Sequence, residues 1–241
     1  MTNHRGVALV VGAGPGLGAA LARCFAGAGM DVGVVARSAA LLADICRDME
    51  AKGLRGLAYG CDAAEEADVE ALFRRVEADL GTADLVVYNA GLFIPGGILD
   101  IRTSDLERSW RVCCLGGFLV GREAARALMA RQRAGGAGGT ILFTGATASL
   151  RGSAGFACLA VGKFGLRALA QSMAREFGPQ GIHVAHVVVD AMIAGPRSGE
   201  TTVADAHADP EAIAATYLAL HRQSRSAWTH ELDLRPWVER F

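Results

Sequence analysis

The sequence predicts an α/β fold in which one doubly wound, mainly parallel sheet of seven strands is flanked by helices. Three observations lead to this prediction. The chain has 241 residues, a length that suits one well-buried domain, so residues 1–241 are expected to form a single unit. Short apolar segments without polar alternation recur along it, as is typical of strands buried on both faces. Amphipathic segments separate them, and strands that alternate with helices form parallel sheets.

The elements follow one another in a regular order. The first six expected strands span Val7–Val11, Val32–Ala36, Gly56–Gly60, Asp84–Tyr88, Thr140–Thr144 and Ile182–Val189. The expected helices between them span Leu17–Ala28, Ala39–Lys52, Glu65–Leu80, Ser104–Arg133 and Gly155–Phe177. A late helix near Pro210–Gln223 and a last strand near Glu231–Leu234 complete the pattern. The small, polar segment Ala194–Asp209 shows no periodicity and is predicted to be a mobile loop.

Composition excludes several classes of partner. The 24 Lys and Arg residues nearly balance the 25 Asp and Glu residues, so neither a nucleic acid nor a membrane surface is an expected partner. The six cysteines show no CxxC spacing, which favours buried thiols in a reducing compartment over disulfides or a metal site. A cytoplasmic protein without a metal is therefore expected.

A glycine-rich turn directly follows the first expected strand and leads into a helix. Its sequence is Gly12-Ala13-Gly14-Pro15-Gly16-Leu17-Gly18, a GxxxGxG pattern. Glycines permit a tight turn and a close approach of the backbone to a pyrophosphate, and the helix N-terminus favours negative charge. We expect Gly12, Gly14, Gly16, Leu17 and Gly18 to bind a dinucleotide.

The end of the second expected strand indicates which dinucleotide. It reads Ala36-Arg37-Ser38, without the carboxylate that would accept hydrogen bonds from a ribose 2′-hydroxyl. The Arg37 guanidinium suits a 2′-phosphate, with Ser38 beside it, so NADP(H) is favoured over NAD(H). The alternative is that Arg37 only caps a solvated turn.

Together these motifs resemble the short-chain dehydrogenase/reductase family, over almost the whole chain. GxxxGxG is the family's cofactor motif, Asp62 matches its adenine-contacting acid, and Asn89-Ala90-Gly91 resembles part of its NNAG signature with Tyr88 in the first Asn position. Lys163 opens a stretch similar to the one that contains the family's catalytic lysine. The resemblance implies a Rossmann fold, a ribose contact by Lys163, and a homodimer or homotetramer. A solvated Lys163 side chain is the alternative.

The usual catalytic positions of that family are mostly empty here. Counting from Lys163, the tyrosine position is Leu159, the serine position is Ala146, and the asparagine position falls near Cys113. The chain has three tyrosines, and none is near Lys163 in sequence: Tyr59, Tyr88 and Tyr217. Carbonyl reduction by the usual proton relay is therefore not expected.

Other residues have a structural and a functional interpretation. Cys113 and Cys158 are more simply inert buried thiols than reactive ones. His183 and His186 fit an apolar strand better than a ligand set. Asp190 either orients a loop near the nicotinamide or only forms a turn.

Two functions remain open from the sequence. The first is an NADP(H)-dependent oxidoreductase acting on a small organic carbonyl, alcohol or activated alkene, with a non-standard proton source such as water, the substrate, Thr147 or Lys163. Lys163 and Thr147 are thus the candidate catalytic residues, and Phe93, Phe156 and the 194–209 loop are expected to set the specificity. The second is a protein that binds the cofactor without redox turnover, as a regulatory subunit or for non-redox chemistry.

Overall fold

The computed structural model describes residues 5–195, 198–199 and 201–239 of the chain. They form one seven-stranded sheet in the order β3-β2-β1-β4-β5-β6-β7, and every neighbouring pair is parallel. The strands are β1 Val7–Val11, β2 Asp31–Ala36, β3 Gly56–Gly60, β4 Leu85–Tyr88, β5 Thr140–Ala146, β6 His183–Val189 and β7 Glu231–Leu234. The predicted fold class and single parallel sheet are confirmed.

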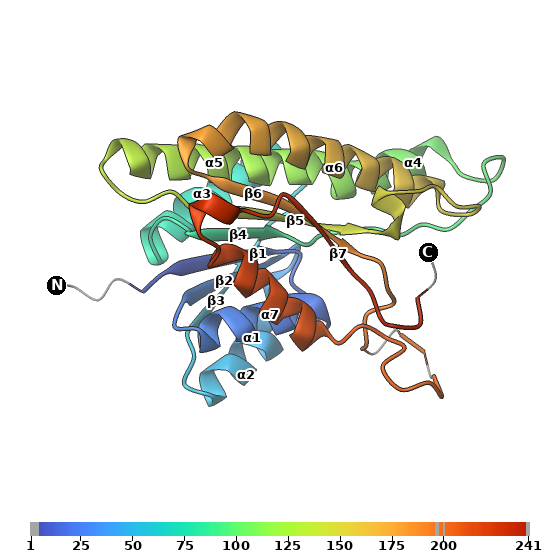
Figure 1. Ribbon diagram of the computed structural model, residues 1–241, viewed down its shortest axis with the longest axis horizontal. Helices are drawn as coiled ribbons and strands as arrows, with labels where there is room; N and C mark the ends of the chain where they lie inside the picture. Colours follow the sequence, from blue (N-terminus) through green and yellow to red (C-terminus); the bar gives the residue numbers. More distant parts are fainter. Residues whose placement is uncertain (1–4, 196–197, 200, 240–241) are drawn as a thin grey trace.

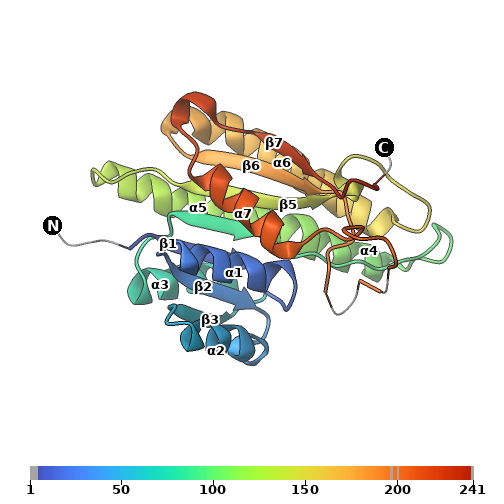
Figure 2. The same ribbon diagram turned by 60° about the horizontal axis from the view of Figure 1, so that its bottom comes forward.

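Helices cover both faces of the sheet (Figure 1). One face is covered by α1 Leu17–Gly27, α2 Ala43–Ala51 and α7 Pro210–His221, and α1 and α7 lie side by side in Figure 2. The other face is covered by α3 Glu66–Asp79, α4 Thr103–Trp110, α5 Gly116–Arg133 and α6 Ala157–Phe177. Short helical turns at Ala39–Leu42, Thr147–Ser149, Gly178–Gln180 and Arg225–Ala227 connect these elements.

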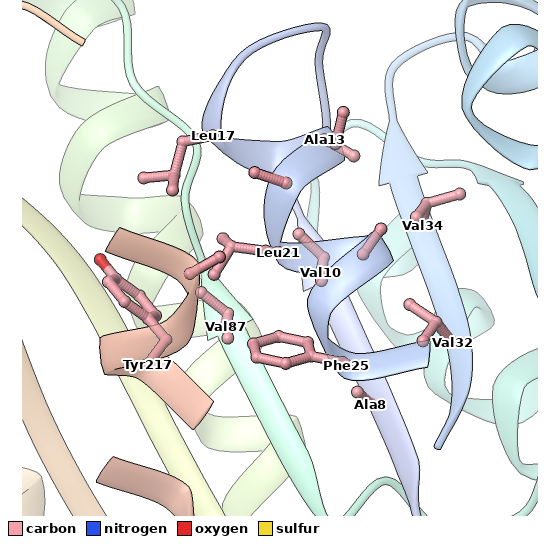
Figure 3. Close-up of a cluster of buried hydrophobic side chains, with 14 of the residues drawn as sticks. Ala8, Val10, Ala13, Leu17, Leu21, Phe25, Val32, Val34, Val87 and Tyr217 are labelled. Atoms are coloured by element: carbon pink, nitrogen blue, oxygen red, sulfur yellow. The ribbon is translucent and has the colours of Figure 1, made fainter. Parts of the chain in front are cut away.

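Strand periodicity divides the apolar core into two layers. Successive side chains of a strand point to opposite faces, so Ala8 and Val10 pack under α1 and α7, while Leu9 packs toward α3 and α5. Figure 3 shows the first layer, in which Phe25 of α1 and Tyr217 of α7 lie against the strands. The whole of β1 is buried, which explains its continuous apolar sequence.

One predicted helix is interrupted. The segment expected as a single helix over 104–133 contains a π-helical turn at Arg111–Leu115 between α4 and α5. The Tyr88 hydroxyl lies at this turn and donates a hydrogen bond to the Val112 carbonyl oxygen. A Cβ atom at Gly116 would lie 2.2 Å from that hydroxyl, so the helix packs against β4 there only because residue 116 is glycine.

The segment 194–209 is irregular where it is described. Ile193 and Ala208 form an isolated bridge that closes its base. Residues 196–197 and 200 lie outside the described residues, so the predicted mobility of this loop stays a prediction.

Candidate functional site

The candidate site lies at the edge of the sheet where the strands have their carboxyl ends. The chain order reverses between β1 and β4, because β2 and β3 lie on one side of β1 and the later strands on the other. In open parallel sheets, ligands bind outside the carboxyl ends of the strands at such a reversal. In Figure 1 this edge faces right, and the loops after β4, β5 and β6 extend from it.

The loops that follow β1 and β4 meet at this reversal. Gly12 has φ = +91°, and a Cβ atom at this residue would lie 2.4 Å from the Ala90 backbone nitrogen. The Asn89 side-chain amide donates to the Gly12 carbonyl oxygen at 3.0 Å. Gly12, Asn89 and Ala90 therefore hold the two loops together at the strand reversal, and glycine is required at position 12.

The rest of the glycine turn is open. A Cβ atom at Gly14 or at Gly16 would have no neighbouring heavy atom within 4 Å, so the space above these two residues is available to a ligand. Leu17 begins α1 and Gly18 packs against the Ala13 backbone. Within the described chain, no side chain caps this helix and its first turn contains no acidic residue. The helix N-terminus is thus free to favour an anion.

Charged and polar side chains follow β2 and β3 at the same edge. Arg37 and Ser38 are exposed, and Arg37 has no hydrogen bond or ion pair with any residue that the structure describes. Asp62 follows β3, and its Oδ1 atom accepts a hydrogen bond from the Ala64 backbone N–H at 3.0 Å. The Asp62 side chain is therefore fixed in a turn, whereas the Arg37 guanidinium is available for a ligand.

Lys163 lies in α6 with its amine under the site. The residue is buried, and its Nζ donates to the Thr144 carbonyl oxygen at 2.7 Å and to the Ala90 carbonyl oxygen at 3.4 Å. Burial lowers the pKa of this amine. Gly91 is adjacent, since a Cβ atom there would be 3.6 Å from Nζ. The solvated alternative for Lys163 is therefore excluded.

Three polar residues follow the ends of three neighbouring strands. The registers pair Ala146 of β5 with Val189 of β6, and Val189 with Leu234 of β7, so Thr147, Asp190 and Arg235 are one residue beyond the same row. The Thr147 hydroxyl donates to Asp190 Oδ1, and Arg235 Nη1 lies 3.5 Å from Asp190 Oδ2. Asp190 is buried while Thr147 is half-buried. Thr147 thus connects the open site to a buried carboxylate.

Two aromatic rings border this end of the site. Phe93 and Phe156 stack with ring centroids 4.7 Å apart, and both remain partly exposed. Their loops are joined by a hydrogen bond from the Gly96 N–H to the Gly155 carbonyl oxygen at 3.1 Å. This arrangement presents an exposed apolar rim, and the role of these two residues in specificity stays a prediction.

Comparisons with known proteins decide the family. The model of the family described as short chain dehydrogenase matches residues 6–198. The chain belongs to the short-chain dehydrogenase/reductase family. Sorbitol-6-phosphate 2-dehydrogenase of Escherichia coli K12 is 34% identical over 192 residues, which cover 79% of this chain and 73% of that protein. A short-chain dehydrogenase/reductase of Armillaria gallica is 34% identical over 180 residues, covering 74% of this chain and 67% of that protein.

Solved structures of the family have the same fold. A short-chain dehydrogenase from Rhodopseudomonas palustris superposes with a TM-score of 0.83 at 39% identity, covering 96% of this chain and 99% of that one. A metagenomic short-chain oxidoreductase in complex with NADP has a TM-score of 0.83 at 26% identity, covering 97% of this chain and 98% of that one. The second structure shows that a relative of this chain binds NADP.

This short-chain dehydrogenase differs from the family pattern at its centre. Leu159 is half-buried one turn before Lys163, and Ala146 ends β5 beside Thr147. Cys113, in the π-helical turn, is fully buried, and its Sγ accepts a hydrogen bond from the Leu92 N–H at 3.3 Å. Cys113 therefore has a structural contact and replaces the asparagine of the resemblance without offering an amide.

The tyrosines are all placed elsewhere. Each is fully buried and hydrogen-bonded away from Leu159: Tyr59 to Asp79, Tyr88 to the Val112 carbonyl and Tyr217 to the Thr144 hydroxyl. Burial raises the pKa of all three phenols. Within the described chain, no phenol reaches the vacated position.

Sequence reasoning missed Arg235 and left Asp190 undecided. Each of Thr147, Asp190 and Arg235 directly follows a strand, and the sequence shows this. That they lie side by side follows only from the register of β5, β6 and β7. The two strand histidines are core residues as expected: His186 Nδ1 lies 3.1 Å from Glu231 Oε2, and His183 stacks on Trp228. All six cysteines are free.

Proposed function

We propose that this protein is an NADP(H)-dependent oxidoreductase acting on a small organic carbonyl, alcohol or activated alkene. The observation on which the proposal depends is the open glycine turn together with Arg37, which has no hydrogen bond or ion pair among the described residues. Gly14 and Gly16 leave space where a pyrophosphate would approach the N-terminus of α1. The exposed Arg37 guanidinium offers the fork of donors that matches a 2′-phosphate, so NADP(H) is favoured over NAD(H).

The remaining cofactor residues have separate tasks in this proposal. With NADP(H) bound, Ser38 would lie beside the 2′-phosphate and Asp62 would contact the adenine. The Asn89-Ala90-Gly91 segment lies at the strand reversal. Two of the three donors of the Lys163 amine bind the Thr144 and Ala90 carbonyl oxygens, and the third would be offered to a ribose. The bound nicotinamide supplies or accepts the hydride.

Thr147 and Lys163 supply the polar chemistry next to the substrate. The Thr147 hydroxyl already donates to Asp190, which leaves its oxygen lone pairs available to accept a hydrogen bond from a substrate hydroxyl. Lys163 keeps a positive or proton-donating group below the same space, and its lowered pKa makes proton release easier. The proton route is therefore one without a phenol.

A second candidate function is supported by Leu159 and Ala146. A protein that binds the cofactor without redox turnover, as a regulatory subunit or for non-redox chemistry, has no need of the family's phenol and serine hydroxyl. The same glycine turn and Arg37 would bind the cofactor in both cases, so only turnover separates them.

We also propose a cytoplasmic location and a homo-oligomeric state for the protein. Six free cysteines fit a reducing compartment, the cytoplasm. Trp110, Phe118, Val161 and Phe164 leave apolar side chains exposed on α4, α5 and α6, which supports a homodimer or homotetramer through these helices. No helix of the described chain is both long and apolar enough to cross a membrane.

Binding titrations test the cofactor assignment. Arg37→Ala is expected to weaken NADPH binding by about 1–3 kcal/mol, the scale of a charged hydrogen bond, and to leave NADH binding nearly unchanged. Arg133→Ala is the control. Arg133 is exposed at the C-terminal end of α5, away from the glycine turn, so its substitution should alter neither affinity. An equal loss for both dinucleotides in Arg37→Ala would contradict the assignment, and failure of the wild type to bind either would remove the proposed function.

A further inference from the structure

The buried carboxylate of Asp190 is the feature that the proposed function does not yet explain. Only 4% of this residue is exposed, and its backbone N–H donates to the Leu234 carbonyl oxygen at 2.8 Å, which fixes its position after β6. One carboxylate oxygen accepts the Thr147 hydroxyl hydrogen. A buried charge is costly, and structures retain one where it has partners or a task.

Two carboxylates and one guanidinium meet at Asp190 among the described residues whose contacts are given. Arg235 is shared by two carboxylates, with Nη2 2.8 Å from Asp233 Oδ2 and Nη1 3.5 Å from Asp190 Oδ2. The guanidinium is thus closer to Asp233, whose side chain is much more exposed than that of Asp190. One guanidinium against two carboxylates leaves the cluster of Thr147, Asp190, Asp233 and Arg235 with a net charge of −1.

The cluster lies on the side of the strand reversal toward which the nicotinamide half of a bound dinucleotide would extend. If Arg37 after β2 binds the 2′-phosphate and the turn after β1 binds the pyrophosphate, the other half extends past the strand reversal, over β4, β5 and β6. Thr147 and Asp190 follow β5 and β6. An oxidised nicotinamide ring carries one positive charge and a reduced ring is neutral, so a negative cluster distinguishes the two forms.

We propose that Asp190, acting through Thr147, sets this site for alcohol oxidation and makes it bind NADP⁺ in preference to NADPH. The inference rests on the proposed function. Asp190 is a positioning residue: it orients the Thr147 hydroxyl and accepts the proton which that hydroxyl passes on. The substrate class is an alcohol with an apolar group that fits the rim formed by Phe93 and Phe156.

The step balances with the oxidised dinucleotide as hydride acceptor. The carbinol C–H bond breaks, and its electron pair leaves with the hydride to NADP⁺, which becomes NADPH. The substrate O–H bond breaks at the same time, its proton passes to Thr147 Oγ, and the Thr147 proton passes to Asp190 Oδ1 along the existing hydrogen bond. The carbon–oxygen double bond forms. After the product has left, the proton returns from Asp190 to the Thr147 oxygen along the same hydrogen bond, and Thr147 releases one proton to solvent.

The ratio of the dissociation constants of NADPH and NADP⁺ tests the inference without turnover. Calorimetric titration at one pH and salt concentration is expected to give a ratio above one for the wild type. Asp190→Asn keeps the shape and an acceptor oxygen but removes the charge, and should lower the ratio by roughly tenfold. Glu176→Gln removes the same charge from the exposed, opposite end of α6 and should leave the ratio unchanged.

A second variant provides a change of opposite sign. Arg235→Gln removes the cation that offsets Asp190, so its ratio should exceed that of the wild type. Ratios that are equal in the wild type, Asp190→Asn and Arg235→Gln would overturn the inference while leaving NADP(H) binding in place. Absence of binding for both cofactor forms in the wild type would instead overturn the proposed function beneath it.

Discussion

The glycines of the turn after β1 fall into three kinds of surroundings. At Gly12 the reasons are a positive φ and the Ala90 backbone. At Gly18 the reason is packing, because a Cβ atom would lie 2.6 Å from Ala13 Cα. At Gly14 and Gly16 nothing in the described protein fills the space. One motif therefore combines positions where the protein itself requires glycine with positions that leave open space.

This division predicts opposite effects for two similar substitutions. Gly18→Ala should lower the free energy of unfolding by about 1–3 kcal/mol, because the new methyl group must displace backbone. Gly14→Ala should leave the free energy of unfolding nearly unchanged but weaken NADPH binding by about tenfold or more, because the methyl group occupies the cradle. Urea unfolding and NADPH titration of both variants provide the measurements. A Gly14→Ala protein that binds NADPH like the wild type would show that the open space is not the phosphate site.

At the scale of elements, the β6–β7 edge of the sheet contains an unusual number of ionisable groups. His183 and His186 are buried in β6, and Glu231 of β7 contacts both His186 and Arg167, with Arg167 Nε 2.7 Å from Glu231 Oε2. Burial lowers the pKa of His186 to about 4 and also lowers that of His183. The Arg167 guanidinium keeps the pKa of the Glu231 carboxyl below its usual value.

These shifts predict acid sensitivity of the fold. A histidine with a depressed pKa stays neutral in the folded state while the unfolded chain takes up a proton, so stability falls as the pH drops from about 6.5 toward 4. The pKa of Glu231 is lowered in the folded state, so its contribution to the free energy of unfolding is also lost as the pH falls and the carboxylate becomes protonated. His186 alone accounts for roughly 3 kcal/mol at most.

Urea unfolding across this pH range checks the effect. His186→Gln should flatten the dependence of unfolding free energy on pH, whereas His207→Gln, outside this edge, should not. An unchanged pH dependence in His186→Gln would mean that another group is responsible.

Sequence patterns predicted these elements well and their interactions less well. The apolar strands were found because burial on both faces leaves a continuous signature, as in Val7–Val11. The π-helical turn at Arg111–Leu115 was not found, because a single wider turn hardly changes the amphipathic pattern of 104–133. The glycine turn could be read from its spacing, and the empty Leu159 and Ala146 positions followed from the family resemblance. The cluster of Thr147, Asp190 and Arg235 could not, since it depends on the register of β5, β6 and β7.

At the scale of the whole molecule, the carboxyl edge of the sheet and one helix-covered face present different surfaces. The carboxyl edge has the glycine turn and Arg37, while α4, α5 and α6 on one face expose Trp110, Phe118, Val161 and Phe164. Half-exposed aromatic side chains on neighbouring helices are typical of an interface with another subunit.

Light scattering at micromolar concentration is therefore expected to show a closed homodimer or homotetramer. Phe164→Asp should shift the protein to a smaller species, because a carboxylate in an apolar interface is unfavourable. Leu41→Asp is the matched control: Leu41 is 73% exposed and precedes α2 on the other face, so its change should not affect the mass. A monomeric wild type would contradict this arrangement.

We propose that hydride transfer at this site proceeds without a phenol, and substitution of Thr147 tests this claim. Turnover should be followed by nicotinamide absorbance for wild type, Thr147→Ser and Thr147→Val against a panel of alcohols with NADP⁺ and of aldehydes, ketones and activated alkenes with NADPH. We expect turnover by the wild type, retention within several-fold in Thr147→Ser, and a loss of roughly 10²-fold or more in Thr147→Val at unchanged NADPH affinity. A wild type that binds NADPH yet turns over nothing in the panel, or a Thr147→Val protein as active as the wild type, would contradict the claim.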